Sequence, residues 1–148
     1  MKIIFTKLSD EEHSVRVVRA DGSEDSGILN SRSCLRHDLA HFAVETELPI
    51  AGGYWGSVAN GVALAGNEFS GSGIATAESL AAPIQTLMRL NASDEKYIAV
   101  LAHVLPEVAT EELALRIKER IRKLLGHWKA TAYGADMEFE WDDRISTK

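Results

Sequence analysis

Two histidines and a glutamate recur at four-residue intervals in one short stretch of the chain. His37, His41 and Glu45 lie within the segment HDLAHFAVE. Because residues four apart lie on one face of an α-helix, a helix would place the three side chains in one column. Two imidazoles and a carboxylate are typical ligands of zinc or another divalent transition metal, and three ligands leave a position for water. The spacing therefore predicts a metal site with His37, His41 and Glu45 as ligands.

Asp38 directly follows the first histidine. It occupies the place where zinc hydrolases with an H-E-x-x-H motif carry their general base, so we expect Asp38 to act as a catalytic base or to orient a ligand. Aspartate is one methylene shorter than glutamate, which shortens its reach toward a metal-bound water. The second half of the zincin signature does not follow. The sequence therefore leaves other third ligands open, namely Glu68, Glu78, His103 and His127.

The distribution of charge along the chain favours a cation over an anion near the two histidines. Residues 37–88 contain no lysine or arginine but carry five carboxylates, namely Asp38, Glu45, Glu47, Glu68 and Glu78. Such carboxylates suit a divalent cation and repel phosphate. Basic residues gather instead in residues 116–129, where they alternate with apolar residues as on a solvated helix face. The net charge of −6 argues against a dedicated nucleic-acid binder.

The histidine segment also has interpretations without a metal. Its apolar positions, including Leu39 and Phe42, could form the core face while the histidines bond backbone carbonyls beside it. A thiolate at Cys34 with His37 nearby would be a nucleophilic site. Two function classes remain at this stage: a metal-binding protein with hydrolase activity, and a non-catalytic module. The latter would bind a small molecule or protein through the histidine helix and the glycine-rich residues 52–73.

The pattern of the remaining chain predicts an α+β fold. Residues 2–8, 14–20 and 25–29 are short β-rich runs separated by polar turns, as in a β-meander. Residues 136–141 alternate apolar and acidic side chains, and we expect this strand to pair with the meander. Helices are expected at residues 35–48, 54–65, 77–90 after a Thr76 cap, and after Ser93 and Thr110. The order predicts a small antiparallel sheet packed against about five helices.

Length and composition place the chain among ordinary globular proteins. Its 148 residues are 45% hydrophobic and 26% charged, which predicts one domain over residues 1–148. The single cysteine and the lack of a signal-peptide pattern favour the cytoplasm. The longest apolar run, residues 98–105, is too short to span a bilayer. We therefore expect no membrane or nucleic-acid partner, and a homo-oligomer stays open.

The chain also resembles a known family. The segment LRHDLAHFAVE at residues 35–45, followed by Leu48, by GYWG at residues 53–56 and by a closing segment from Trp128 to Trp141, resembles a family of small bacterial proteins. Members of that family carry H-D-L-x-H-F-x-V-E followed by a G-[FY]-W-G turn. The likeness spans most of the chain, although its motif is confined to residues 35–61. It implies bacterial origin and a single domain, and it leaves the activity open.

Overall fold

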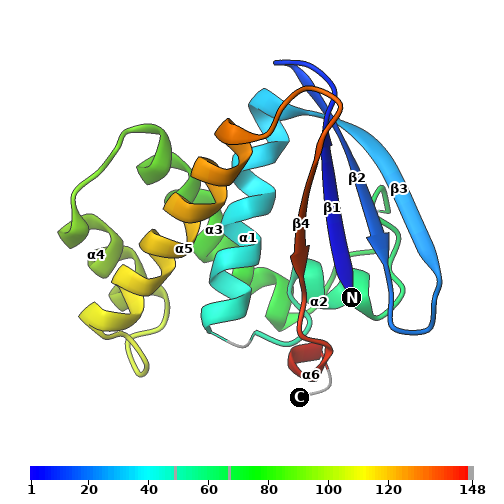
Figure 1. Cartoon of the computed structure of the whole chain (residues 1–148). Coiled ribbons are helices and arrows are strands. Elements are labelled where there is room, and N and C mark those ends of the chain that lie inside the picture. Colours follow the sequence, from blue (N-terminus) through cyan, green and yellow to red (C-terminus); the bar gives the residue numbers. More distant parts are fainter. Residues whose placement is uncertain (49, 67, 147–148) are drawn as a thin grey trace.

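The computed structural model describes residues 1–48, 50–66 and 68–146 and has the predicted α+β fold (Figure 1). The strands are β1 (Lys2–Lys7), β2 (Glu12–Val18), β3 (Glu24–Asn30) and β4 (Asp136–Glu140). The helical elements are η1 (Ser31–Leu35), a π-helical segment, and α1 (Arg36–Glu47), α2 (Tyr54–Ala59), α3 (Ser72–Arg89), α4 (Asp94–Val104), α5 (Glu111–Ala130) and α6 (Asp143–Ser146). None of the helices in the described ranges is long and apolar enough to cross a membrane.

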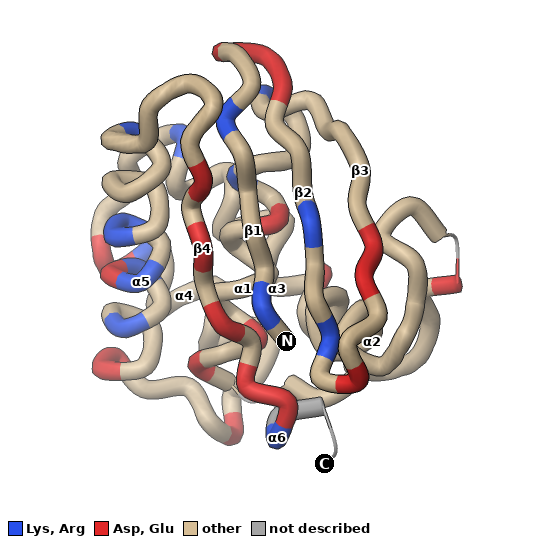
Figure 2. Tube along the Cα trace, turned by 45° about the vertical axis from the view of Figure 1, so that its right-hand side comes forward, with Lys and Arg blue, Asp and Glu red and all other residues tan. Residues whose placement is uncertain are grey.

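The four strands form one antiparallel sheet in the order β3-β2-β1-β4. The predicted pairing of the C-terminal strand with the meander is confirmed, because β4 lies beside β1 with Met137 opposite Phe5. Both of these side chains are fully buried on the helix side of the sheet. The acidic residues of β4, which are red along this strand in Figure 2, are exposed and alternate with buried Met137 and half-buried Phe139. The alternation in the sequence therefore matches the alternation of β4 side chains between the helix-covered face and the solvent.

Helix α1 lies between the sheet and helices α3, α4 and α5 (Figure 1). One buried cluster joins the sheet to α1, α2 and the end of α5, and it includes Leu39, Phe42 and Trp55. A second joins α1 to α3, α4 and α5. Ala40 and Ala43 of α1 are fully buried in this second cluster together with Ala81 of α3. Small side chains let two helix backbones approach closely, so polar side chains at the ends of this contact can meet.

Two helices differ from their predicted bounds. Helix α3 begins at Ser72 after Gly71, which has a φ of 102°, so Thr76 lies inside the helix and is not its cap. Helix α2 ends at Ala59 instead of Ala65 because Gly61 takes a positive φ of 100°. The amides of the two residues after its cap then bond the carbonyls of Val58 and Ser57, as in a Schellman motif. The glycine thus ends the helix through its left-handed backbone.

His13 of β2 is a buried titratable group in the sheet core. Its side chain has no exposed surface and packs against the rings of Phe5 and Trp128. Its Nδ1 lies 2.9 Å from Oγ of Ser31. Burial lowers the pKa of His13 from 6.5 to about 4. The folded protein therefore keeps this imidazole neutral at a pH where the unfolded chain would protonate it.

This burial predicts a loss of stability in mild acid. Between pH 6.5 and pH 5 the unfolded chain takes up a proton that folded His13 does not, so the free energy of unfolding falls by roughly 2 kcal/mol through this group. Above about pH 7.5 both states are neutral and the effect vanishes. We expect urea unfolding of His13→Gln to show a smaller decrease over this interval than the wild type. Parallel pH profiles of the two proteins would contradict this assignment.

Candidate metal centre

Helices α1 and α3 run side by side in opposite directions and bring two pairs of polar side chains together. Near the start of α1, Nδ1 of His37 lies 3.0 Å from Oε1 of Gln85, which belongs to the last turns of α3. One turn further along α1, Nε2 of His41 lies 2.9 Å from Oε2 of Glu78. Glu78 and Gln85 are seven residues apart and hence share one face of α3. The helix pair therefore supplies a polar patch from both of its members.

Three potential ligand atoms converge in this patch. Nε2 of His37 and Nε2 of His41 are 3.1 Å apart, and Oε2 of Glu78 lies 3.3 Å from the first and 2.9 Å from the second. Among the residues that the structure describes, His37, His41 and Glu78 form the group that could hold a metal ion. Ligands at 2.0–2.1 Å from a tetrahedral metal would be separated by about 3.3 Å. The three edges of the triangle are thus close to those of a metal site.

The hydrogen-bond partner of Nδ1 determines which ring nitrogen of each histidine carries the hydrogen. Nδ1 of His41 is 2.9 Å from a carboxylate oxygen of Glu45, and Nδ1 of His37 faces the amide oxygen of Gln85. Both partners are acceptors, so each Nδ1 carries a hydrogen and donates it. When the rings are neutral, each Nε2 therefore carries no hydrogen and is an acceptor. The two Nε2 atoms face each other and an oxygen of Glu78. Three acceptors at this separation repel one another unless a cation lies between them.

Glu45, the predicted third ligand, lies on the other side of His41. Its side chain is fully buried and bonds Nδ1 of His41, whereas the converging atoms are the two Nε2 nitrogens. The backbone amides of Tyr54 and Trp55 also donate to Glu45, at 2.8 and 3.0 Å. These amides open α2, where unpaired N–H groups attract a carboxylate. Glu45 therefore orients His41, and Glu78, one of the alternative ligands in the sequence, supplies the carboxylate at the group.

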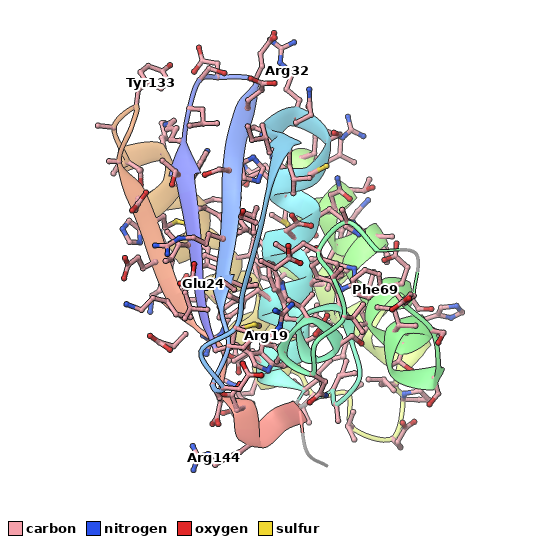
Figure 3. The ribbon with its side chains drawn as sticks, turned by 90° about the vertical axis from the view of Figure 1, so that its right-hand side faces the viewer. Arg19, Glu24, Arg32, Phe69, Tyr133 and Arg144 are labelled. Atoms are coloured by element: carbon pink, nitrogen blue, oxygen red, sulfur yellow. The ribbon has the colours of Figure 1, made fainter. Side chains whose placement is uncertain are left out.

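Helix α2 is held at both ends by buried or half-buried charges. Glu45 receives its first amides, and Arg19 donates through Nε to the carbonyl of Val58 at 2.6 Å and through Nη2 to the carbonyl of Val62 at 3.2 Å. Figure 3 labels Arg19, which extends from the end of β2 toward this helix. Orphan groups at both helix ends are thus satisfied by side chains from α1 and from the sheet. Glu45, which bonds His41, is thus bound to a helix that Arg19 connects to the sheet.

Gly53 permits the contact between Glu45 and α2. A Cβ on Gly53 would lie 2.6 Å from Oε2 of Glu45, and that carboxylate is held in place by its hydrogen bonds. We expect Gly53→Ala to lower the free energy of unfolding by about 1–3 kcal/mol through overpacking. Gly126 of α5 is the matched control, because a Cβ there meets nothing within 4 Å.

Gly126→Ala should raise the free energy of unfolding by about 0.5–1 kcal/mol, since alanine favours the helix interior. Urea unfolding of both variants measures this difference in sign. Equal effects of the two substitutions would show that Gly53 and Glu45 are not closely packed.

Burial and the neighbouring carboxylates shift the pKa of His41 in opposite directions. Burial by itself would lower the pKa of this imidazole, but the hydrogen bonds and negative charges of Glu45 and Glu78 outweigh burial and raise it. The pocket of carboxylates therefore favours positive charge at His41. A proton on Nε2 is one cation that meets this demand, and a metal ion between the three ligand atoms is another.

Asp38, the predicted catalytic base, is buried beside this group but is not one of its converging members. Its Oδ2 has no hydrogen-bond partner among the described residues, and its backbone carbonyl accepts from Nε1 of Trp55 at 3.0 Å. Burial raises the pKa of Asp38 to about 7, although the nearby charge of His41 partly offsets it. Its role as a base stays a prediction.

The other sequence candidates do not join the converging atoms. Cys34 is half-buried and bonds Ser33, and Glu68, His103 and His127 are exposed on other segments. Gln85 is the residue that sequence reasoning missed. Its seven-residue spacing from Glu78 on a helix matches two turns, and this is the signal that could have indicated it.

One side of the triangle is open to solvent. The side chains of Glu78 and His37 are 53% and 30% exposed, whereas that of His41 is 2% exposed. The buried histidine thus anchors the group, and the other two members lie at the surface. A fourth position beside them can be reached by water.

Comparison of the chain with protein-family models, curated proteins and solved structures found no match.

Proposed function

We propose that the protein binds one divalent transition-metal ion, with zinc as the best match, through Nε2 of His37, Nε2 of His41 and a carboxylate oxygen of Glu78. The observation that carries the proposal is the convergence of these three atoms at 2.9–3.3 Å while both Nδ1 atoms are used by other partners. Without a cation, three acceptors would face each other at a cost in free energy. Nitrogen and oxygen ligands of this kind suit zinc.

The surrounding residues support the proposal because they orient the ligands. Metal-bound histidines usually donate their other N–H to a carboxylate or carbonyl, which fixes the tautomer and strengthens the ligand. Glu45 does this for His41, and the amide oxygen of Gln85 does it for His37. The sequence around the group adds no cation, since residues 37–88 lack lysine and arginine. The local charge therefore favours a positive ion.

Three protein ligands and an exposed side would leave a coordination position for water. Zinc in such a site lowers the pKa of its bound water to about 7 and so supplies a nucleophile at neutral pH. Hydrolysis is consequently the class of chemistry that we propose for the loaded site. Asp38 is the residue of this segment that we propose to take up a proton, as its buried carboxyl lies next to His37 in the chain.

Equilibrium dialysis of untagged protein against zinc tests the proposal. We expect one zinc per chain, and we expect Glu78→Gln to weaken binding by at least tenfold because a neutral amide replaces a charged ligand. Glu68→Gln is the matched control, since Glu68 is an exposed glutamate in the same acidic stretch. It should bind zinc as the wild type does. Substoichiometric binding, or equal loss in both variants, would overturn the proposal.

A further inference from the structure

A cavity lies at the start of α1. It has a volume of about 380 Å³ and is formed by the end of β1, the β1–β2 turn, η1, the start of α1 and the end of α5. Arg36 faces this cavity beside α5, whereas the next residue, His37, faces Gln85 of α3. The cavity is therefore separate from the candidate metal centre. Its size is at the lower end of the range for small-molecule pockets.

The cavity is basic although the protein as a whole is acidic. Its charged lining residues are four cations and one carboxylate, namely Lys7, Arg32, Arg36, Lys129 and Asp10. The net charge of the chain, by contrast, is −6. Figure 2 shows lysine and arginine gathered along α5, which ends here. Like charges around one concave surface raise the local concentration of anions.

Most of these charges are not neutralised by the protein. In the described part of the chain, Arg36 and Lys129 make no ion pair, and Asp10 is held by the hydroxyl of Tyr133. Arg32 pairs with Glu11 at 2.9 Å, but both side chains are largely exposed. Figure 3 shows Arg32 and Tyr133 at this same end of the sheet. Arg36 and Lys129 are thus available to an anion.

The floor of the cavity is apolar. It includes Leu35, Leu125 and Trp128, of which Leu35 and Trp128 are buried and Leu125 is half-buried. The ammonium of Lys7 lies 5.4 Å from the centroid of the Trp128 ring and so borders the aromatic surface. Apolar lining with a few convergent polar groups is typical of sites for small organic ligands.

A buried hydroxyl completes the lining. Ser31 is 8% exposed, lines the cavity and bonds Nδ1 of His13, whose Nε2 has no partner among the described residues. An N–H on Nε2 would be an orphan donor, which is rarer in proteins than an unused acceptor. With the hydrogen on Nδ1, His13 donates to Ser31. The hydroxyl hydrogen of Ser31 is then left for an acceptor in the cavity.

We propose that this cavity binds a small organic anion, in which a carboxylate or phosphate head group is joined to a flat apolar body. Arg36 and Lys129 meet the head group, and Ser31 donates a hydrogen bond to it. The body lies on Leu35, Leu125 and Trp128. Both features are required, because the cations alone would attract any anion and the floor alone any apolar molecule.

Titration with four probes, monitored by ¹H–¹⁵N NMR, tests this assignment. Phenyl phosphate and benzoate carry both features, inorganic phosphate carries only the charge, and benzyl alcohol carries only the body. We expect saturable shifts at the amides of Ser31, Arg32 and Trp128 with phenyl phosphate, benzoate or both, and the better of the two identifies the head group. Inorganic phosphate and benzyl alcohol should bind at least tenfold more weakly.

One variant tests the role of the two cations, and a second is its control. The double variant Arg36→Gln/Lys129→Gln should raise the Kd of the better probe by about tenfold, since charge-assisted hydrogen bonds are lost. Arg122→Gln removes a cation from α5 outside the cavity and should leave the Kd within twofold. Equal weakening in both proteins, equal binding of benzyl alcohol, or the lack of saturable shifts at these amides would overturn the proposal.

Discussion

Replacement of Glu45 by alanine is expected to lower the free energy of unfolding by about 3–5 kcal/mol. Glu45 has no exposed surface, and it accepts from the amides of Tyr54 and Trp55 and from Nδ1 of His41. Its removal leaves these three donors, and the amide of Gly56 at 3.4 Å, buried or half-buried without an acceptor. Because domains of this size are stable by only about 5–15 kcal/mol, the variant should be close to unfolding at room temperature. Urea unfolding followed by tryptophan fluorescence measures the loss.

Glu47→Ala is the matched control for this prediction. Glu47 lies two residues further along α1 and pairs with Arg116 and Arg120, whose side chains are 51% and 38% exposed. Glu47 itself is 12% exposed but both of its partners reach solvent, so screening is partial and we expect a smaller loss, of about 1–2 kcal/mol. Glu45→Gln keeps the shape of the side chain and should remain folded. It should nevertheless weaken zinc binding by roughly 10–100-fold, because the orienting carboxylate is lost. Equal stability of the Glu45→Ala and Glu47→Ala proteins would contradict this role of Glu45.

Zinc is expected to stabilise the wild-type protein and to have no such effect on His41→Ala. At a free zinc concentration of 100 times the Kd, binding to the folded state adds about 2.7 kcal/mol to the free energy of unfolding. For a chain of this length that corresponds to a rise in Tm of roughly 5–10 °C. His41 supplies a central ligand atom, since its Nε2 lies within 3.1 Å of both other members of the group. Its loss removes the site.

His103→Ala separates this effect from nonspecific binding of zinc to histidine. His103 lies near the end of α4, is exposed and is not part of the converging group. We expect this variant to retain the full rise in Tm. Differential scanning calorimetry with and without zinc provides the measurement. A rise in Tm that persists in His41→Ala would place the zinc elsewhere.

The histidine column illustrates how far sequence spacing can predict a site. The helical period places His37 and His41 on one face of α1, and their Nε2 atoms do meet. The same period cannot determine which nitrogen of His41 faces Glu45. That depends on where the start of α2 packs, because its amides draw the carboxylate of Glu45 toward them. Local spacing therefore predicts the histidines, whereas the role of Glu45 depends on a contact between separate elements.

In the fold, too, local patterns predict some features whereas others depend on contacts between separate elements. The alternation in residues 136–141 predicts a strand with one buried face, and β4 has this pattern beside β1. Thr76 resembles a cap and so predicts too late a start for α3, which begins directly after Gly71 with its positive φ. Glu78 and Gln85 reach the histidines only because α3 packs antiparallel to α1. Such partners depend on packing between elements distant in the sequence, which periodicity does not report.

The nitrogen resonances of the imidazoles, observed by ¹⁵N NMR before and after addition of one equivalent of zinc at neutral pH, test the central claim most directly. The claim is that the cation between His37, His41 and Glu78 is a metal ion. We predict that zinc shifts Nε2 of both histidines to the range of metal-bound nitrogen, while each Nδ1 keeps its hydrogen toward Gln85 or Glu45. If both nitrogens of His41 instead carry a hydrogen after this addition, the cation is a proton and the metal site is contradicted.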